Sequence, residues 1–188
     1  MNMMDTIKGS MMENFFPKGW DLQKIEDCCA TAPERALDRM PHWHKDFVTE
    51  ECVDVASFNM QMGYEIAKQI KRTRDESKKL ALILSVGPMG MYKWAVYFLK
   101  DWNCSCDHVS GFNMDEWSDA QGNTLPSDDP GAFQNAMQEV FYGPLGDLTV
   151  PKNQRNFATK DNLPQYADKI QKIKDSGGEL ITIYGIGR

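Results

Sequence analysis

The hydrophobic and polar residues change their spacing several times along the chain, and each change predicts an element. Over about Glu50–Ser77, apolar residues recur at helical spacing and basic residues crowd the last turns, which predicts a long helix. A short apolar run over 79–86, bounded by charge and by Gly87-Pro88, predicts a buried strand, and similar runs over 108–114 and 179–184 predict two more. Further helices are predicted over 21–29, 33–39, 89–102, 130–141 and 164–174. The apolar positions of the long helix are Val53, Ala56, Met60, Tyr64, Ala67 and Ile70.

Strands that alternate with helices form parallel crossover units, so the sequence predicts an α/β protein. We expect a three-layer sandwich built on a mostly parallel, Rossmann-like sheet. Residues 51–188 would form this domain, and residues 1–50 an irregular and helical N-terminal extension; the stretch 143–163 reads as a loop. The last strand enters a Gly-x-Gly turn close to Arg188, where a helix or active-site loop normally follows. We therefore expect the chain to be truncated at the C-terminus, as the front portion of a longer protein.

Composition and charge narrow the class of protein. A chain of 188 residues can bury one full core. Its formal net charge of −6 argues against a broad nucleic-acid or anionic-membrane surface. Five cysteines, an odd number with neighbouring pairs, are no disulfide framework and suggest reduced thiols. With no signal peptide and no stretch near the roughly 18 apolar residues of a membrane span, the sequence predicts a soluble, cytoplasmic protein.

The hexapeptide Phe112–Trp117 places acids directly after the second predicted strand. Ligands of open α/β sheets bind at the carboxyl ends of the strands, so Asp115 is a candidate proton-transfer base. Partial burial would have to raise its pKa toward the working pH. Adjacent residues at a strand end point in opposite directions, so only one of Asp115 and Glu116 can face a given substrate. The alternative is that both acids cap the following loop or helix.

The turn from Ser85 to Gly90 joins the first predicted strand of the sheet to a helix. Its glycines let backbone N–H groups approach an anion, and the helix N-terminus favours negative charge, so a phosphate group could bind there. The alternative is a tight turn whose glycines only satisfy the backbone geometry. The turn holds no lysine and is no nucleotide P-loop.

Two further patterns could be interpreted as a metal site and as a cofactor pocket, but the sequence favours neither interpretation. Cys104-Ser-Cys106-Asp-His108, with His42 and His44, could supply metal ligands, but their spacing matches no common structural zinc motif. We interpret them as ordinary core and surface residues and expect no metal. The methionines and aromatic residues of the first 50 positions suit core filling, or an oligomer or interdomain contact, better than a cofactor pocket.

Four collinear motifs lie between about Leu80 and the C-terminus. They are Pro88-Met-x-x-Tyr92-Lys93, then Phe112-Asn-Met-Asp-Glu-Trp117, then Leu125-Pro126 with Pro130 and Phe133, and finally Tyr184-Gly-Ile-Gly187. Together they resemble the glucosamine-6-phosphate deaminase/isomerase family, which has Phe-Asn-Met-Asp-Glu-Tyr in place of the second motif. The relatives that are 6-phosphogluconolactonases typically have Asp-Glu-Arg there.

The resemblance implies an isomerising deamination of glucosamine 6-phosphate to fructose 6-phosphate and ammonia, with no cofactor. A second copy of the chain, in a homo-oligomer, is a candidate partner. Asp115 would be the base that moves a proton between C2 and C1. Ser85, Val86 and Gly87, together with Glu116, would bind the phosphorylated amino sugar.

The sequence also departs from the family pattern. Leu84-Ser-Val-Gly-Pro88 replaces the family's Thr-Gly-Gly-Thr-Pro, residues 118–124 are extra, and Arg188 precedes the place of the Asp-Gly-His motif. We therefore expect isolated residues 1–188 to lack deaminase activity, whereas the parent protein would be the enzyme. A 6-phosphogluconolactonase-like hydrolase and a non-catalytic sugar-phosphate-binding module are the alternatives.

Overall fold

The computed structural model describes residues 21–30, 48, 50–87 and 89–185. The chain divides into two units, Met1–Glu50 and Glu51–Arg188. In the first unit the expected helix near 21–29 is α2 (Leu22–Cys29), and the Asp21 carboxylate accepts the N–H of Lys24 at its start. The predicted helix over 33–39 and the histidines at 42 and 44 lie outside the described residues.

The second unit is built on a four-stranded parallel sheet, which confirms the predicted α/β class. Its strands are β1 (Leu80–Leu84), β2 (Val109–Asn113), β3 (Arg155–Asn156) and β4 (Glu179–Thr182), in the spatial order β3-β2-β1-β4. β1, β2 and β4 match the three predicted strands. β3 lies in the stretch predicted as a loop, because two residues are too few to show an alternating pattern.

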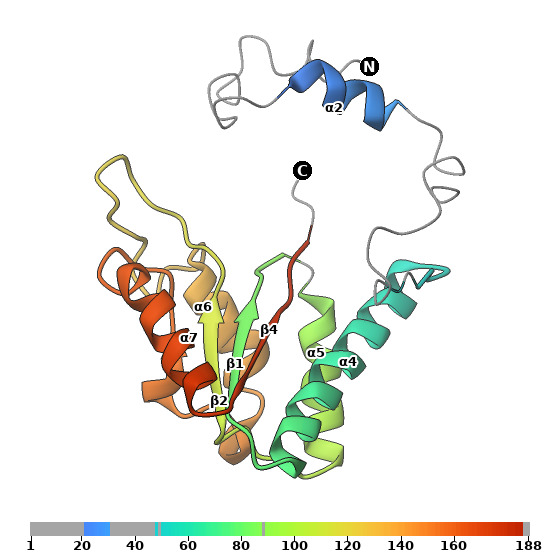
Figure 1. Ribbon diagram of the computed structural model, residues 1–188, viewed down its shortest axis with the longest axis vertical. Coiled ribbons are helices and arrows are strands. Elements are labelled where there is room, and N and C mark those ends of the chain that lie inside the picture. The colour runs from blue at the N-terminus through green and yellow to red at the C-terminus, as the bar shows by residue number, and fades with distance from the viewer. Residues whose placement is uncertain (1–20, 31–47, 49, 88, 186–188) are drawn as a thin grey trace. The chain divides into compact units, whose positions relative to one another are not determined.

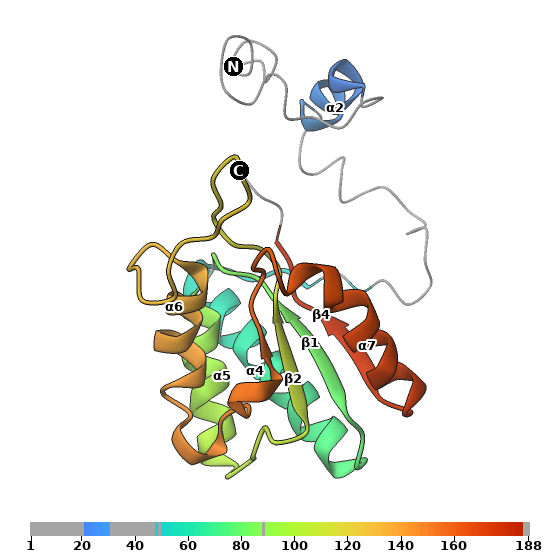
Figure 2. The ribbon, with the colours of Figure 1, turned by 90° about the vertical axis from the view of Figure 1, so that its left-hand side faces the viewer.

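Helices cover both faces of this sheet. Figure 1 shows α4 (Val55–Asp75) and α5 (Gly90–Asp101) side by side on one face and α7 (Tyr166–Asp175) on the other. Figure 2 shows α6 (Phe133–Met137) beside α5. The helix predicted over 130–141 is thus shorter as an α-helix, and it continues as a π-helix over Gln138–Tyr142. Short 3-10 turns occupy Gly146–Leu148, Lys152–Gln154 and Leu163–Gln165.

The long helix α4 begins later than its apolar pattern predicts, and it buries only part of the predicted apolar face. Asp54 caps it by accepting the N–H of Ser57 at 2.7 Å, so the helix begins at Val55 rather than near Glu50. Val53, which lies before the cap, is 93% exposed. Met60 and Tyr64 are also exposed, although the Tyr64 ring contacts Phe98 of α5 edge-on. Ala67 and Ile70 are buried as predicted. The buried residues of α4 are Gly63, Ile66, Ala67, Ile70 and Thr73.

The hydrophobic core lies between the sheet and the α4–α5 layer. α4 and α5 approach closely at Gly63, where an added Cβ would lie 2.4 Å from the Cβ of Trp94 and 2.5 Å from the carbonyl oxygen of Met91. The largest fully buried side chains include Tyr92, Tyr142, Phe112 and Phe141. None of the helices within the described ranges is both long and apolar enough to cross a membrane.

An ion-pair network ties the edge strand β4 to α4, and it predicts a pH-dependent contribution to stability. Glu179 accepts hydrogen bonds from Arg72 at 2.5 Å and from Lys78 at 2.7 Å, and these contacts lower the pKa of Glu179 to about 2. Since the folded pKa lies below the unfolded value of about 4.3, the stabilisation is complete above the unfolded pKa and is lost as the pH falls toward 2.

We expect Glu179→Gln to lower the free energy of unfolding at pH 7 by about 1 kcal/mol or less, since the network is partly exposed to solvent. The variant should also flatten the pH dependence of stability between about pH 4.3 and 2. Urea denaturation across this range measures both effects. Asp107→Asn, which removes one longer and more exposed ion pair with Arg74, is the control. An unchanged pH profile in Glu179→Gln would contradict the assignment.

Candidate functional site

The carboxyl ends of β1 and β2 bring the two sequence motifs to one edge of the sheet. Leu84 is in register with Asn113, and the N–H of Met114 donates to the carbonyl oxygen of Leu84 at 2.9 Å. The turn that follows Leu84 and the acids that follow Asn113 therefore start as neighbours. Figure 1 shows the loop after β2 rising above this edge.

Asp115 lines a cavity of about 320 Å³ at this edge of the sheet. No described residue donates a hydrogen bond to its carboxylate. Partial desolvation, followed by repulsion from the neighbouring carboxylate of Glu116, raises the pKa of Asp115 above its ordinary value. The cavity is lined by Met114, Asp115, Glu116, Ser118, Gly122, Thr124, Ala158, Lys160 and Leu163. A carboxylate that accepts no hydrogen bond from the described residues, and whose pKa is raised, can accept a proton from a ligand in this cavity.

Glu116 has a different environment, although it lines the same cavity. Its carboxylate accepts the N–H groups of Trp117 at 2.9 Å, Phe133 at 2.8 Å and Gln134 at 2.9 Å. Phe133 and Gln134 begin α6, so Glu116 caps that helix from a distance in sequence. The alternative that both acids cap the following loop or helix therefore fits the contacts of Glu116. It does not fit Asp115, which accepts no such hydrogen bond from the described residues. A ligand-binding role for Glu116 stays a prediction.

The turn after β1 has features that suit an anion. The Oγ of Ser85 is buried and has no hydrogen-bond partner among the described residues, and the Ser85 carbonyl oxygen accepts the Tyr92 hydroxyl at 2.6 Å. Val86 is half-buried and Gly87 is exposed. No side chain caps the N-terminus of α5, so backbone N–H groups remain there for a ligand. Phosphate binding by Ser85, Val86 and Gly87 stays a prediction.

Asn113 is a candidate that the sequence pattern did not single out. It is fully buried as the last residue of β2, and neither its Oδ1 nor its Nδ2 has a partner among the described residues. Buried amides are nearly always hydrogen-bonded, so an unpaired one at a ligand edge is informative. The sequence feature that could have identified Asn113 is a polar residue at the end of an apolar strand.

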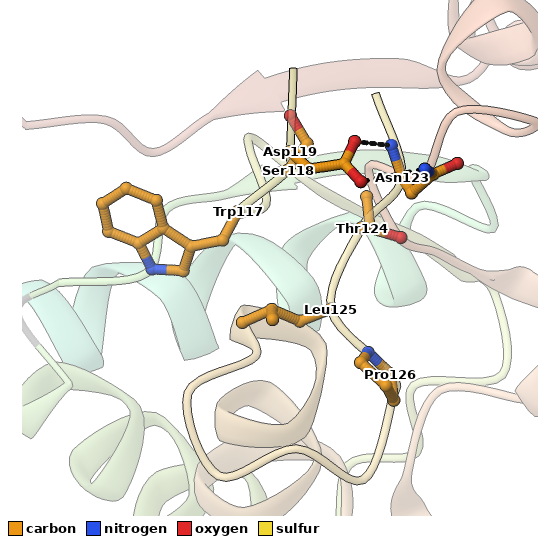
Figure 3. Close-up of a pocket in the computed structure, with 7 residues that line it drawn as sticks. All are labelled: Trp117, Ser118, Asp119, Asn123, Thr124, Leu125 and Pro126. Atoms are coloured by element: carbon orange, nitrogen blue, oxygen red, sulfur yellow. Dashed lines mark hydrogen bonds between the residues drawn. The ribbon is translucent and has the colours of Figure 1, made fainter. Parts of the chain in front are cut away.

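The loop after Glu116 folds into a hairpin whose residues line two pockets. Ser118 pairs with Thr124, and the Asp119 carboxylate accepts the N–H groups of Gln121 and Asn123. Ser118 and Thr124 line the cavity of Asp115 and also a second pocket of about 390 Å³. Figure 3 shows Trp117 across this second pocket from Asp119, Asn123 and Thr124, with Leu125 below them. The Trp117 indole packs against Phe133 with ring centroids 5.6 Å apart.

The residues from Cys104 to His108 lie at the start of β2, away from the edge that holds Asp115. Burial raises the pKa of Cys106 to about 12, so its thiol stays protonated at neutral pH. The His108 Nε2 lies 3.0 Å from the Thr73 hydroxyl and 3.1 Å from the Ile70 carbonyl oxygen, inside the core. Within the described part of the chain, no group of three His, Cys, Asp or Glu side chains could hold a metal ion.

In comparisons with known proteins, the chain is similar to curated glucosamine-6-phosphate deaminases. No family model matches the sequence. A glucosamine-6-phosphate deaminase of Caenorhabditis elegans is 30% identical over 145 residues, which are 76% of this chain and 51% of the relative. One from Borrelia garinii subsp. bavariensis is 28% identical over 123 residues, or 64% of this chain and 43% of the relative.

A solved structure shares the fold. It is that of a monomeric glucosamine-6-phosphate deaminase of the NagB superfamily, with a TM-score of 0.56 and 21% identity over 73% of this chain and 54% of that one. The chain spans about half the length of the curated relatives it matches. Over that half, the chain is similar in sequence to glucosamine-6-phosphate deaminases and shares the fold of one of them.

Proposed function

We propose that the chain carries the proton-transfer half of a glucosamine-6-phosphate deaminase site. The observation that supports this most is the Asp115 carboxylate, which opens into a cavity at the carboxyl end of β2 with a raised pKa and no hydrogen bond from the described residues. The turn 85–87 would bind the 6-phosphate at the N-terminus of α5. Glu116 would hold the hairpin and α6 in place around the base.

The chemistry follows from one base and one water. Asp115 removes the proton from C2 of the open-chain amino sugar. The C–H electron pair forms the C1–C2 double bond while the C1=O π pair moves onto O1, which takes a proton from solvent to give the enolamine. The protonated carboxyl group then returns its proton to C1, where the C1–C2 π pair forms the new C–H bond, and the nitrogen lone pair forms a C2=N bond as nitrogen releases one proton to solvent. Water adds to C2, and ammonia leaves as fructose 6-phosphate forms. The raised pKa of Asp115 suits a group that must both take and return a proton.

Exchange of the C2 proton tests this proposal without requiring the whole reaction. The chain is incubated with glucosamine 6-phosphate in deuterium oxide, and NMR follows the loss of the C2 signal while a separate assay follows ammonia. We expect exchange above the uncatalysed rate. Binding without exchange would instead support a non-catalytic sugar-phosphate-binding module. Hydrolysis of 6-phosphogluconolactone with no exchange would support the lactonase alternative.

Asn113 provides a prediction in which stability and binding change in opposite directions. Asn113→Leu replaces a buried, unpaired amide with an apolar side chain of similar size, so the free energy of unfolding should rise by about 1 kcal/mol. If the amide is kept for a ligand or a bound water, the affinity for glucosamine 6-phosphate should fall at least about threefold, the loss of one hydrogen bond. Urea denaturation and calorimetric titration measure the two effects. A destabilised variant with unchanged affinity would show a purely structural role.

A further inference from the structure

Lys160 shares the cavity of Asp115 and is the one cationic side chain among the nine residues that line it. It follows β3 in the stretch that the sequence pattern predicts as a loop. The N–H groups of Asn162 and Leu163 donate to the carbonyl oxygen of Thr159, which fixes the backbone next to Lys160. Lys160 is therefore held on an ordered turn that forms part of the cavity wall.

The contacts of Lys160 leave part of its hydrogen-bonding capacity unused. Its Nζ donates to the backbone carbonyl oxygen of Gln121 at 3.0 Å. It forms no ion pair with a carboxylate within the described ranges. An ammonium group has three donors, so two remain for a ligand. Gln121 lies in the hairpin residues 118–124 that are extra relative to the family pattern, and these residues thus position the lysine.

The charges in the cavity indicate which end of a sugar phosphate fits there. Asp115 and Glu116 contribute two negative charges and Lys160 one positive charge, so the lining carries a net charge of −1. A phosphate dianion would be repelled from this lining, and the residues of the turn 85–87 are not part of it. The cavity therefore suits the other end of the ligand, which carries an amino group and a carbonyl oxygen.

We propose that Lys160 binds the C1 oxygen of the amino sugar and stabilises the negative charge that develops there as Asp115 takes the C2 proton. This inference rests on the proposed function of Asp115. As the C–H pair forms the C1–C2 double bond, the C1=O π pair moves onto O1, and a Lys160 N–H donates a hydrogen bond to it. O1 gains its proton from solvent, and the nitrogen releases one to solvent when the C2=N bond forms. The proton count therefore balances.

Two stable analogues distinguish this role from phosphate binding. 2-Amino-2-deoxygluconate 6-phosphate carries a carboxylate at C1, and 2-amino-2-deoxyglucitol 6-phosphate carries a neutral hydroxyl group there. Calorimetric titration gives both affinities for the wild-type chain and for Lys160→Met. We expect the variant to lose about 10- to 100-fold in affinity for the carboxylate analogue, the effect of one charge-assisted hydrogen bond, and about twofold or less for the alcohol. Lys160→Arg should retain most of the preference.

Controls separate local from general effects. Lys174→Met removes the same charge from the end of α7, and Gln121→Ala keeps the backbone carbonyl that holds Lys160. Both should bind the analogues as the wild-type chain does, and circular dichroism checks that every variant is folded. An equal loss for the two analogues would make Lys160 a phosphate ligand and overturn the inference. So would an unchanged Lys160→Met, or a wild-type chain that binds neither analogue.

The rate of C2 proton exchange keeps this inference separate from the proposed function. If the wild-type chain exchanges the proton, Lys160→Met should slow exchange about 100-fold, as loss of an oxyanion donor does. If it prefers the carboxylate analogue through Lys160 but shows no exchange, the deaminase proposal fails and the C1-oxygen site stands.

Discussion

Replacing Asp115 by Asn is expected to slow exchange of the C2 proton by about 1,000-fold while leaving the affinity for glucosamine 6-phosphate nearly unchanged. The amide has the same shape but cannot take the proton. Because no described residue donates a hydrogen bond to the Asp115 carboxylate, the substitution breaks no contact of the fold. It also removes a charge that Glu116 repels, so the free energy of unfolding should not fall.

Glu116→Gln is the matched control for this experiment, since it changes the adjacent acid in the same way. Its carboxylate accepts three backbone N–H groups, two of them from the first residues of α6. We expect this variant to lose about 1 kcal/mol of stability, as at a lost helix cap, and to keep most of its exchange rate. NMR exchange rates and urea denaturation of both variants make the comparison. Full exchange in Asp115→Asn with loss of exchange in Glu116→Gln would reverse the two roles.

The sequence predicted the parts of the fold whose pattern is local. β1, β2 and β4 are apolar runs between breakers, and hydrophobic periodicity shows such runs directly. β3 was missed because its two residues become a strand only by pairing with Gly111 and Phe112. The buried face of α4 was predicted only in part, with Ala67 and Ile70 buried but Met60 and Tyr64 exposed. Packing against other elements selects which residues are covered, and helical spacing alone does not contain that choice.

The same distinction between local patterns and contacts of distant segments applies to the candidate site. The position of Asp115 at a strand end could be read from the sequence, because the apolar strand and the acids are adjacent in the chain. The cap from Glu116 to Phe133 and the approach of Lys160 to the cavity join distant segments. No local pattern marks either. The likeness to the family supplied Asp115 as a base, whereas Lys160 and the unpaired amide of Asn113 required the fold.

Gly111 and Tyr142 give the prediction with the largest expected effect on stability. Gly111 lies in β2, and an added Cβ would meet the Tyr142 hydroxyl oxygen at 2.4 Å. Tyr142 is fully buried in the π-helix, with the Arg155 guanidinium 4.7 Å from its ring centroid, so it has little room to move. We therefore expect Gly111→Ala to lower the free energy of unfolding by about 3 kcal/mol through overpacking.

Tyr142→Phe should remove most of that loss when combined with Gly111→Ala. The hydroxyl has no hydrogen-bond partner in the described part of the chain, so its removal alone should change stability by less than about 1 kcal/mol. Without it, the nearest atom to the new Cβ is Cζ at 3.4 Å, an ordinary contact distance. Urea denaturation of the wild type, both single variants and the double variant completes the cycle. We expect a favourable coupling of about 2 kcal/mol.

Gly87→Ala is the control for a glycine replaced in open space, since a Cβ there would meet no atom within 4 Å. It should leave stability nearly unchanged. Failure of Tyr142→Phe to rescue Gly111→Ala would mean that the backbone of β2, and not the hydroxyl, requires glycine. The outcome also bears on the site, because β2 delivers Asn113 and Asp115 to the edge of the sheet. If Gly111→Ala displaces β2, it should slow C2 proton exchange, and the double variant should restore the rate together with the stability.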